Sequence, residues 1–237
     1  AGAVTILPRL AQADGHAGDR FSTGAGEIVV HPVSHASIVL ETPAGTIYVD
    51  PVGDPASYGA FPAADLVLIT HEHGDHYNPE TLGTLIGDET ALITNPAVQE
   101  MLPEGLTARA QVLANGESTA FGAVSIDAIP AYNTTEGRLD FHPEGRDNGY
   151  VLGFDGFRVY VSGDTEDIPE MRALEGIDLA FVCKAESLEQ LSWLEQGHKV
   201  KMIRTGELHF GVDTEQDLRD IEEYIRREGI RLGKPRL

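Results

Sequence analysis

The sequence predicts a mixed α/β fold in which strands dominate. Three features support this prediction. Short β-branched segments with a period of two are broken by glycine or proline, other apolar runs are continuous as in strands covered on both faces, and short helical segments lie between them. The 237 residues, 41% of them hydrophobic, suit one large domain or a domain with a small appendage.

The elements follow one another in a regular way along the chain. A helix is expected at 78–87, with Asn78 as its N-cap and Pro79 in its first turn, because both residue types favour these positions. Asp155 and Gly156 predict a tight hairpin between two strands. Further helices are expected at 97–102 and 167–174, and strands at 27–33, 37–42, 46–51, 65–70, 91–95, 108–113, 124–133, 149–155, 157–164 and 178–183.

The charge and the cysteine content exclude several classes of protein. The formal net charge of −21 repels nucleic acid and anionic membranes. Cys183 is the only cysteine, so the chain can form neither an internal disulfide nor a thiolate zinc cluster. No run approaches the roughly 18–20 apolar residues of a membrane span. We therefore expect a small-molecule substrate and no nucleic-acid or membrane partner, and leave open whether the chain forms a homo-oligomer.

Residues 1–24 are expected to form a flexible N-terminal segment. The letters "AQA" before Asp14 have the small-x-small form of a signal-peptidase site, but Arg9 interrupts the short apolar stretch and no basic region precedes it. Two interpretations stay open. The segment is either a disordered polar start or the remnant of a signal peptide, which would place a bacterial protein in the periplasm rather than in the cytoplasm.

The stretch "LITHEHGDHYNPE" predicts a metal site. In an extended segment the side chains of residues i and i+2 point the same way. His71 and His73, which follow a predicted buried strand, can therefore bind one ion together. Gly74 would permit a turn, which would direct Asp75 and His76 toward a neighbouring position for a second ion. Imidazole and carboxylate ligands suit Zn²⁺, with Fe or Mn as alternatives.

A second carboxylate follows another predicted strand. Asp164 lies in "VYVSGDT", directly after an apolar run. Taken alone, such a Gly-Asp-Thr turn is more often a structural turn or a helix N-cap. Combined with the first motif, it predicts a carboxylate that can bridge two cations.

These motifs together resemble the metallo-β-lactamase superfamily. "THEHGDH" is followed about 90 residues later by "SGDT", and "HPVSHASIVLET" with "TIYVDP" resembles the opening of the branch that contains the ascorbate-phosphate lactonases. The resemblance covers residues 25–183. It implies an αββα sandwich in which the motif loop lies at the edge of a sheet.

The resemblance also implies roles for individual residues. His71, His73 and His76 match histidine ligands of the family. Asp75 matches the aspartate that binds the second metal and orients the attacking water, so it is the expected catalytic residue. Asp164 matches the bridging carboxylate.

Two expected histidine ligands are less clear. Where the family has a histidine after the strand ending in "IPAYN", this chain has Asn133. Asn133 could bind through its carbonyl oxygen, or His142 from the following loop could take the place. His209 lies at the spacing of the family's late histidine, but the surrounding sequence differs from the family pattern.

The segment 184–237 has a different character and predicts an atypical α-β-α ending. "LEQLSWLEQG", "KVKMI" and "GVDTEQDL" resemble the C-terminal end of the CMP-KDO synthetases (3-deoxy-manno-octulosonate cytidylyltransferases) over 184–230, where Asp213 matches an aspartate that helps to hold Mg²⁺. The Gly-rich nucleotide loop of those enzymes has no counterpart here. A natural fusion, an engineered chimera, a sequence error and a divergent hydrolase ending all stay open.

The resulting expectation is a metal-dependent hydrolase. One or two zinc ions would provide a metal-bound hydroxide that attacks an ester, lactone, amide or phosphoester. One alternative is a metal-binding protein with impaired or no turnover because its C-terminal ligand region is replaced. The other is a fragment of a nucleotidyltransferase. Groups expected just outside the ligands are His35, Asp50, Thr70 and Tyr132.

Overall fold

The computed structural model describes residues 18–183, and the structural statements below concern this part of the chain. The signal-peptide-like letters before Asp14, the α-β-α ending and His209 lie outside the described residues. Within them, no helix has the length and apolar character needed to cross a membrane.

A seven-stranded sheet forms the first half of this part. Its strands follow the sequence order. The first to fourth strands pair antiparallel with their neighbours, and the fourth to seventh pair parallel, so the fourth strand belongs to both parts. Parallel strands need long connections, and the helices of this half lie in those connections. The strands are β1 (Asp19–Thr23), β2 (Gly26–Ser34), β3 (Ser37–Thr42), β4 (Gly45–Val49), β5 (Leu66–Leu68), β6 (Ala91–Thr94) and β7 (Ala110–Val112).

A five-stranded sheet forms the second half, in the order β12-β11-β10-β9-β8. Asp155 and Gly156 have φ of 46° and 86° and join two antiparallel strands by a two-residue turn, which confirms the predicted hairpin. The strands are β8 (Ser118–Phe121), β9 (Val124–Ala131), β10 (Asp147–Phe154), β11 (Phe157–Asp164) and β12 (Leu179–Cys183).

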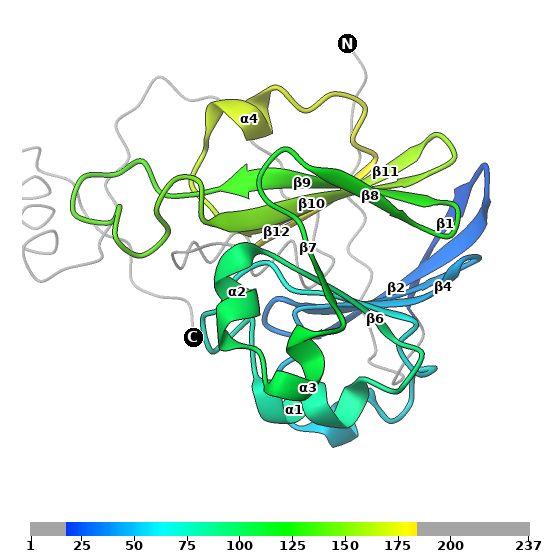
Figure 1. Ribbon diagram of the computed structural model, residues 1–237. Coiled ribbons are helices and arrows are strands. Elements are labelled where there is room, and N and C mark those ends of the chain that lie inside the picture. Colours follow the sequence, from blue (N-terminus) through cyan, green and yellow to red (C-terminus); the bar gives the residue numbers. More distant parts are fainter. Residues whose placement is uncertain (1–17, 184–237) are drawn as a thin grey trace, which may run out of the picture. The chain divides into compact units, whose positions relative to one another are not determined.

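Short helices cover the outer faces of the two sheets, so the αββα arrangement is confirmed (Figure 1). The Asn78 side chain accepts hydrogen bonds from the amides of Glu80 and Thr81, as expected for the N-cap of α1. On the side of the seven-stranded sheet lie η1 (Pro55–Tyr58), α1 (Pro79–Leu85), α2 (Pro96–Met101) and α3 (Glu104–Thr107), and on the other side lies α4 (Pro169–Arg172).

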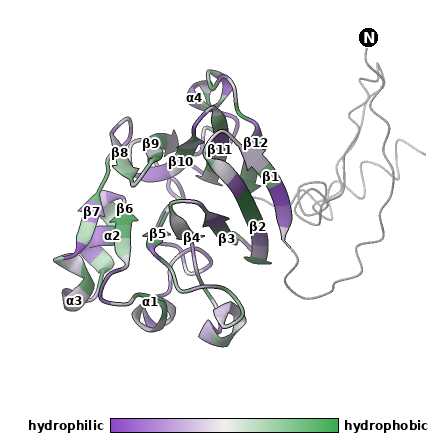
Figure 2. Ribbon diagram, turned by 90° about the vertical axis from the view of Figure 1, so that its right-hand side faces the viewer, coloured by the Kyte–Doolittle hydropathy of each residue, from purple (hydrophilic) through white to green (hydrophobic). Residues whose placement is uncertain are grey.

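Two hydrophobic cores result from this layering. In β5, Leu66 and Leu68 pack into the core between the sheets, whereas Val67 and the following Ile69 pack under the outer helices. The continuous apolar run of β5 is thus explained by burial on both faces. Figure 2 shows the contrast at the sheet edge, where β1 is mainly hydrophilic and the neighbouring β2 has a hydrophobic middle stretch.

The structure also contains elements that the sequence pattern did not predict. The strand β1 lies within 1–24, so the expectation of a flexible segment is wrong for Asp19–Thr23. Its residues are mostly polar and exposed, as an edge strand allows, and its pairing with β2 orders it. The strand β8, the helix α3 and the 3₁₀ turn η1 were missed because each is only four residues long and carries little periodic signal.

The ends of several strands meet at one edge of the sandwich. Asp50 follows β4, Thr70 lies just beyond β5 and Asp164 ends β11. Two hydrogen bonds join the sheets here: the amide of Asn148 donates to the carbonyl of Thr70 at 3.1 Å, and the Tyr150 hydroxyl donates to the carbonyl of Ile69 at 2.9 Å. Side chains from distant parts of the sequence are therefore held close together.

We expect Tyr150→Phe to destabilise the fold by about 1–2 kcal/mol, because the buried carbonyl of Ile69 loses its side-chain donor. Tyr160→Phe is the matched control. The Tyr160 hydroxyl is also buried but has no hydrogen-bond partner among the described residues, so its removal should be neutral or stabilising. Urea unfolding of the three proteins measures the difference. Equal destabilisation by both substitutions would contradict the role of the Tyr150 bond.

Candidate metal centre

The histidine motif forms a tight turn directly after β5. The carbonyl of His73 accepts hydrogen bonds from the amides of His76 and Tyr77, at 2.9 and 2.8 Å. Gly74 is not among the residues with positive φ, and a Cβ added there would meet nothing within 4 Å. The turn thus forms at Gly74 as expected, and its geometry does not require glycine; the two hydrogen bonds to His73 close it.

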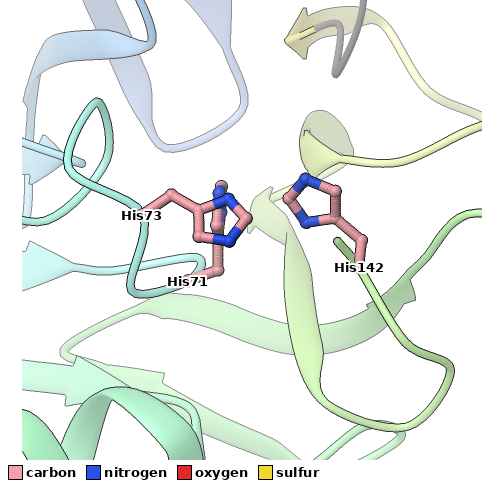
Figure 3. Close-up of side chains that lie close together, drawn as sticks. All are labelled: His71, His73 and His142. Carbon is pink, nitrogen blue, oxygen red and sulfur yellow. The ribbon is translucent and has the colours of Figure 1, made fainter. Parts of the chain in front are cut away.

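Three histidines converge at one position (Figure 3). The rings of His71, His73 and His142 lie 4.6–5.0 Å apart between centroids and stand at steep angles to one another. Each offers a ring nitrogen, and these atoms lie within 4.8 Å of one another. His142 is only 4% exposed, so it is not a loop histidine on the surface. Of the two alternatives for the missing histidine, the structure brings His142 to the cluster.

A second group of donors lies beside the first. Asp75 and His76 point toward a position that also includes His35, and the three donor atoms lie within 4.8 Å of one another. His35 Nε2 is 3.0 Å from Asp75 Oδ2. His76 is fully buried, whereas the side chains of His35 and Asp75 are about half exposed. The donor atoms of the motif therefore belong to two adjacent groups.

Asp164 lies between the two groups. Its Oδ2 is 3.9 Å from His71 Nε2 and 3.6 Å from His142 Nε2, on the side of the three histidines. Its Oδ1 is 3.1 Å from His76 Nε2, on the side of the second group. A carboxylate with one oxygen directed to each position has the geometry of a bridging ligand.

Asp50 and Thr70 contact the Nδ1 atoms of His71 and His76, on the ring side away from Asp164. Asp50 Oδ1 accepts from the Thr70 amide at 2.8 Å, and Asp50 Oδ2 accepts from the Thr70 hydroxyl and from His76 Nδ1, both at 2.7 Å. With its one proton donated to Asp50, the Thr70 hydroxyl can accept from His71 Nδ1, 3.0 Å away. Protons on both Nδ1 atoms leave the Nε2 lone pairs of His71 and His76 directed at Asp164. Asp50 and Thr70 thus occupy the outer positions expected from the sequence.

His142 has its own carboxylate partner. Its Nδ1 lies 2.9 Å from Asp147 Oδ2, and Asp147 is 1% exposed. Burial raises the pKa of Asp147, while the hydrogen bond to His142 opposes this shift. The pair fixes the ring so that Nε2 faces Asp164. A histidine held by a carboxylate at one nitrogen and directed into a cluster with the other is typical of metal ligands.

The electrostatics of the cluster favour a cation. Burial, with a smaller contribution from His76, lowers the pKa of His71 to about 2, so its imidazole is neutral. Burial alone would raise the pKa of Asp164, but contact with His76 and the proximity of His71 and His142 lower it below its usual value. His71 Nε2 and Asp164 Oδ1 are both buried without a hydrogen-bond partner. A divalent cation would supply positive charge to this carboxylate and accept the lone pair of His71 Nε2.

The loop that carries His142 is tied to the rest of the site. The backbone amide of Asn133 donates to the carbonyl of His142 at 2.9 Å. The buried side-chain oxygen of Asn133, Oδ1, has no hydrogen-bond partner among the described atoms. Glu166 Oε2 accepts four hydrogen bonds, from the amide and hydroxyl of both Thr134 and Thr135. These bonds lower the pKa of Glu166 to about 2, although burial opposes the shift.

Three further residues at the site were missed from the sequence. Asp147 supports His142, and Glu72 forms an ion pair with Arg146 on the same loop. The only local signal was the cluster of polar letters "FHPEGRDNGY" before a strand. Tyr132, expected near the ligands, instead donates its hydroxyl to Glu170 at 3.0 Å.

Comparisons with known proteins agree with this geometry. A family model described as beta-lactamase superfamily domain matches residues 30–200, and so extends past Cys183. A solved structure from Parabacteroides distasonis, assigned as a metal-dependent hydrolase, is 45% identical with a TM-score of 0.63, over 70% of this chain and 74% of that one. A metal-dependent hydrolase from Pelotomaculum thermopropionicum is 29% identical over 162 residues, which is 63% of this chain and 69% of that protein.

A shorter match confirms the second resemblance. A 3-deoxy-manno-octulosonate cytidylyltransferase from Bacteroides thetaiotaomicron is 44% identical over 62 residues. This is 26% of the present chain but only 24% of that enzyme. The chain therefore spans about a quarter of the cytidylyltransferase, and the similarity is partial.

We expect Asp50→Asn to weaken metal binding by roughly 10–100-fold, the usual effect of losing a carboxylate behind a histidine ligand. The asparagine side chain carries no negative charge and has one oxygen in place of two. It therefore accepts more weakly from Thr70 and His76, and His76 loses its fixed orientation. Competition with a chromophoric zinc chelator measures the affinity. Asp54→Asn is a control in the same segment, since Asp54 is exposed and caps η1. An equal loss in both variants would contradict the role of Asp50.

We expect Glu166 to anchor the His142 loop in a pH-dependent way. Its pKa is lowered from 4.5 to about 2, so its stabilising effect is complete above about pH 4.5 and is lost as the pH falls toward 2. The difference in stability between the native chain and Glu166→Gln should therefore be constant near neutral pH and shrink in this acidic window. Urea unfolding at a series of pH values measures it. A difference that persists at pH 2 would contradict the ionised anchor.

Proposed function

This chain belongs to the metallo-β-lactamase superfamily and is similar to metal-dependent hydrolases, and we propose that it hydrolyses a small ester, lactone, amide or phosphoester with one or two zinc ions. The hydrolase relatives match only 63–70% of the present chain. The class of substrate is therefore part of the proposal and does not follow from the similarity.

One observation carries this proposal. Asp164 is buried between two groups of donors, and Nε2 atoms of His71, His76 and His142 face it at 3.9, 3.1 and 3.6 Å. If His71, His76 and His142 each carry their proton on Nδ1, their Nε2 atoms carry none, and no hydrogen bond can form between these atoms and Asp164. The arrangement is unfavourable by itself and becomes favourable around divalent cations.

The donor set indicates which ions would fit. His71, His73 and His142 would hold the first ion through three imidazole nitrogens, a ligand set suited to zinc. Asp75 and His76 would hold the second, with Asp164 shared between both. Mixed nitrogen and oxygen ligands also suit Fe or Mn. When bound, such ions polarise the substrate and lower the pKa of a coordinated water toward neutrality.

The exposure of the residues indicates where the substrate would enter. His71 and His76 are fully buried on the closed side, whereas Asp75 is half exposed on the open side. A small substrate can reach the site from this side. There the Asp75 carboxylate would accept a hydrogen bond from the attacking water and orient it toward the substrate.

The proposal predicts metal uptake and metal-dependent turnover. Chain freed of metal by a chelator and titrated with Zn²⁺ should take up one to two ions per monomer by elemental analysis. Hydrolysis of a panel of lactones, esters, amides and phosphoesters should be absent before reloading and return after it. No uptake would refute the proposal, and uptake without turnover across the panel would support the alternative of a metal-binding protein without catalysis.

Asp75→Ala should reduce kcat by about 100-fold or more, since proton transfer and orientation by a placed side chain contribute about 10²–10⁴-fold. The fold should persist, because Asp75 is half exposed. Asp88→Ala is a control at an exposed carboxylate away from the cluster. Steady-state kinetics with zinc in excess compares the variants. Unchanged activity of Asp75→Ala would remove its assigned role.

A further inference from the structure

His35 lies in an unusual place for a surface histidine. It occupies the two-residue loop between β2 and β3, where Ser34 pairs with Ser37. Although it precedes the metal motif by more than thirty residues in sequence, its Nε2 lies 3.0 Å from Asp75 Oδ2. Its ring also meets the ring of His76 edge to face, at a centroid distance of 5.8 Å.

The backbone at His35 is held in the left-handed region, with φ of 48°. Among residues 18–183, only three non-glycine residues have positive φ, namely His35, Asp50 and Asp155. His35 and Asp155 each occupy the first position of a two-residue hairpin loop, where the turn itself favours this conformation. His35 and Asp50 also direct their side chains to the cluster.

A simple ion pair is the other explanation for this contact. His35 and Asp75 are both about half exposed, and an ion pair between exposed groups contributes only about 0–1 kcal/mol. Such a pair does not involve His76, whose ring lies beside that of His35. The donor atoms of His35, Asp75 and His76 all lie within 4.8 Å of one another, which is the arrangement of ligands around one ion.

We propose that His35 is a ligand of the second metal ion, together with Asp75, His76 and the bridging Asp164. This proposal rests on the proposed function and changes the expected role of His35 from an outer group to a direct ligand. It gives the second position three donors from residues 18–183, in addition to the shared carboxylate. The β2–β3 hairpin would thereby be tied to the motif loop by the ion itself.

The proposal is tested by counting the ions that each variant binds. Metal-free chain is titrated with Co²⁺, whose visible absorption reports the ligands, and bound metal is counted by elemental analysis after gel filtration. The native chain should bind two ions in distinguishable steps. His35→Gly should retain the first step and weaken the second by at least about 100-fold, since it loses a direct ligand. Glycine is chosen because it accepts positive φ without strain.

Two controls separate a lost ligand from a loosened hairpin. Ala36→Gly changes the neighbouring residue of the same loop, keeps the imidazole and should bind two ions. Added imidazole should restore the second ion and its absorption band in His35→Gly. The unfolding midpoint of the metal-free form should be similar in all three proteins.

The possible results decide between the proposals. Two ions bound to His35→Gly with unchanged affinity would overturn the role of His35, as would an equal loss in Ala36→Gly or a failure of imidazole to restore binding. A native chain that binds a single ion would overturn the second site but leave the proposed function standing. A native chain that binds no metal would refute the proposed function, and the role of His35 with it.

Discussion

The arrangement of the site depends on one buried carboxylate, that of Asp50. It accepts three hydrogen bonds, two from Thr70 and one from His76. These bonds join the ends of two parallel strands, and they also set which nitrogen of each nearby histidine carries the proton. An unpaired carboxylate at 1% exposure would be costly, so the fold keeps all three hydrogen-bond donors in place. These bonds help to fix the conformation of the motif loop.

The site combines a rigid, buried side with an open side. His71, His76 and Asp164 are enclosed between the two sheets, where neighbouring charges have large effects on pKa. Asp75 and His35 lie at the exposed rim. The proposed ligands therefore divide between the packed part of the fold and a rim that solvent can reach.

The sequence left open whether Asn133 or His142 takes the place of the expected histidine. Nothing local to either residue decides between them. The position of His142 is decided by Asp147 at the start of β10 and by the backbone hydrogen bond from Asn133, just beyond β9. Both contacts require the sheet to be formed. The strand β1 was missed for a similar reason, since its polar residues are ordered by pairing with β2 rather than by their own pattern.

The sequence alone determined the elements whose signal is local. The apolar run of β5, the Asn78 cap, the Asp155-Gly156 turn and the spacing of the histidine motif depend on neighbours within a few residues. Most of the strands, though not β1 and β8, and five of the candidate ligands could therefore be predicted. Only the tertiary structure decided which distant residues complete each group. His35 and His142 reach the motif from separate hairpin and loop segments, because the strand ends converge at one edge of the sandwich. Such convergence depends on sheet pairing over long separations, which periodicity and spacing do not encode.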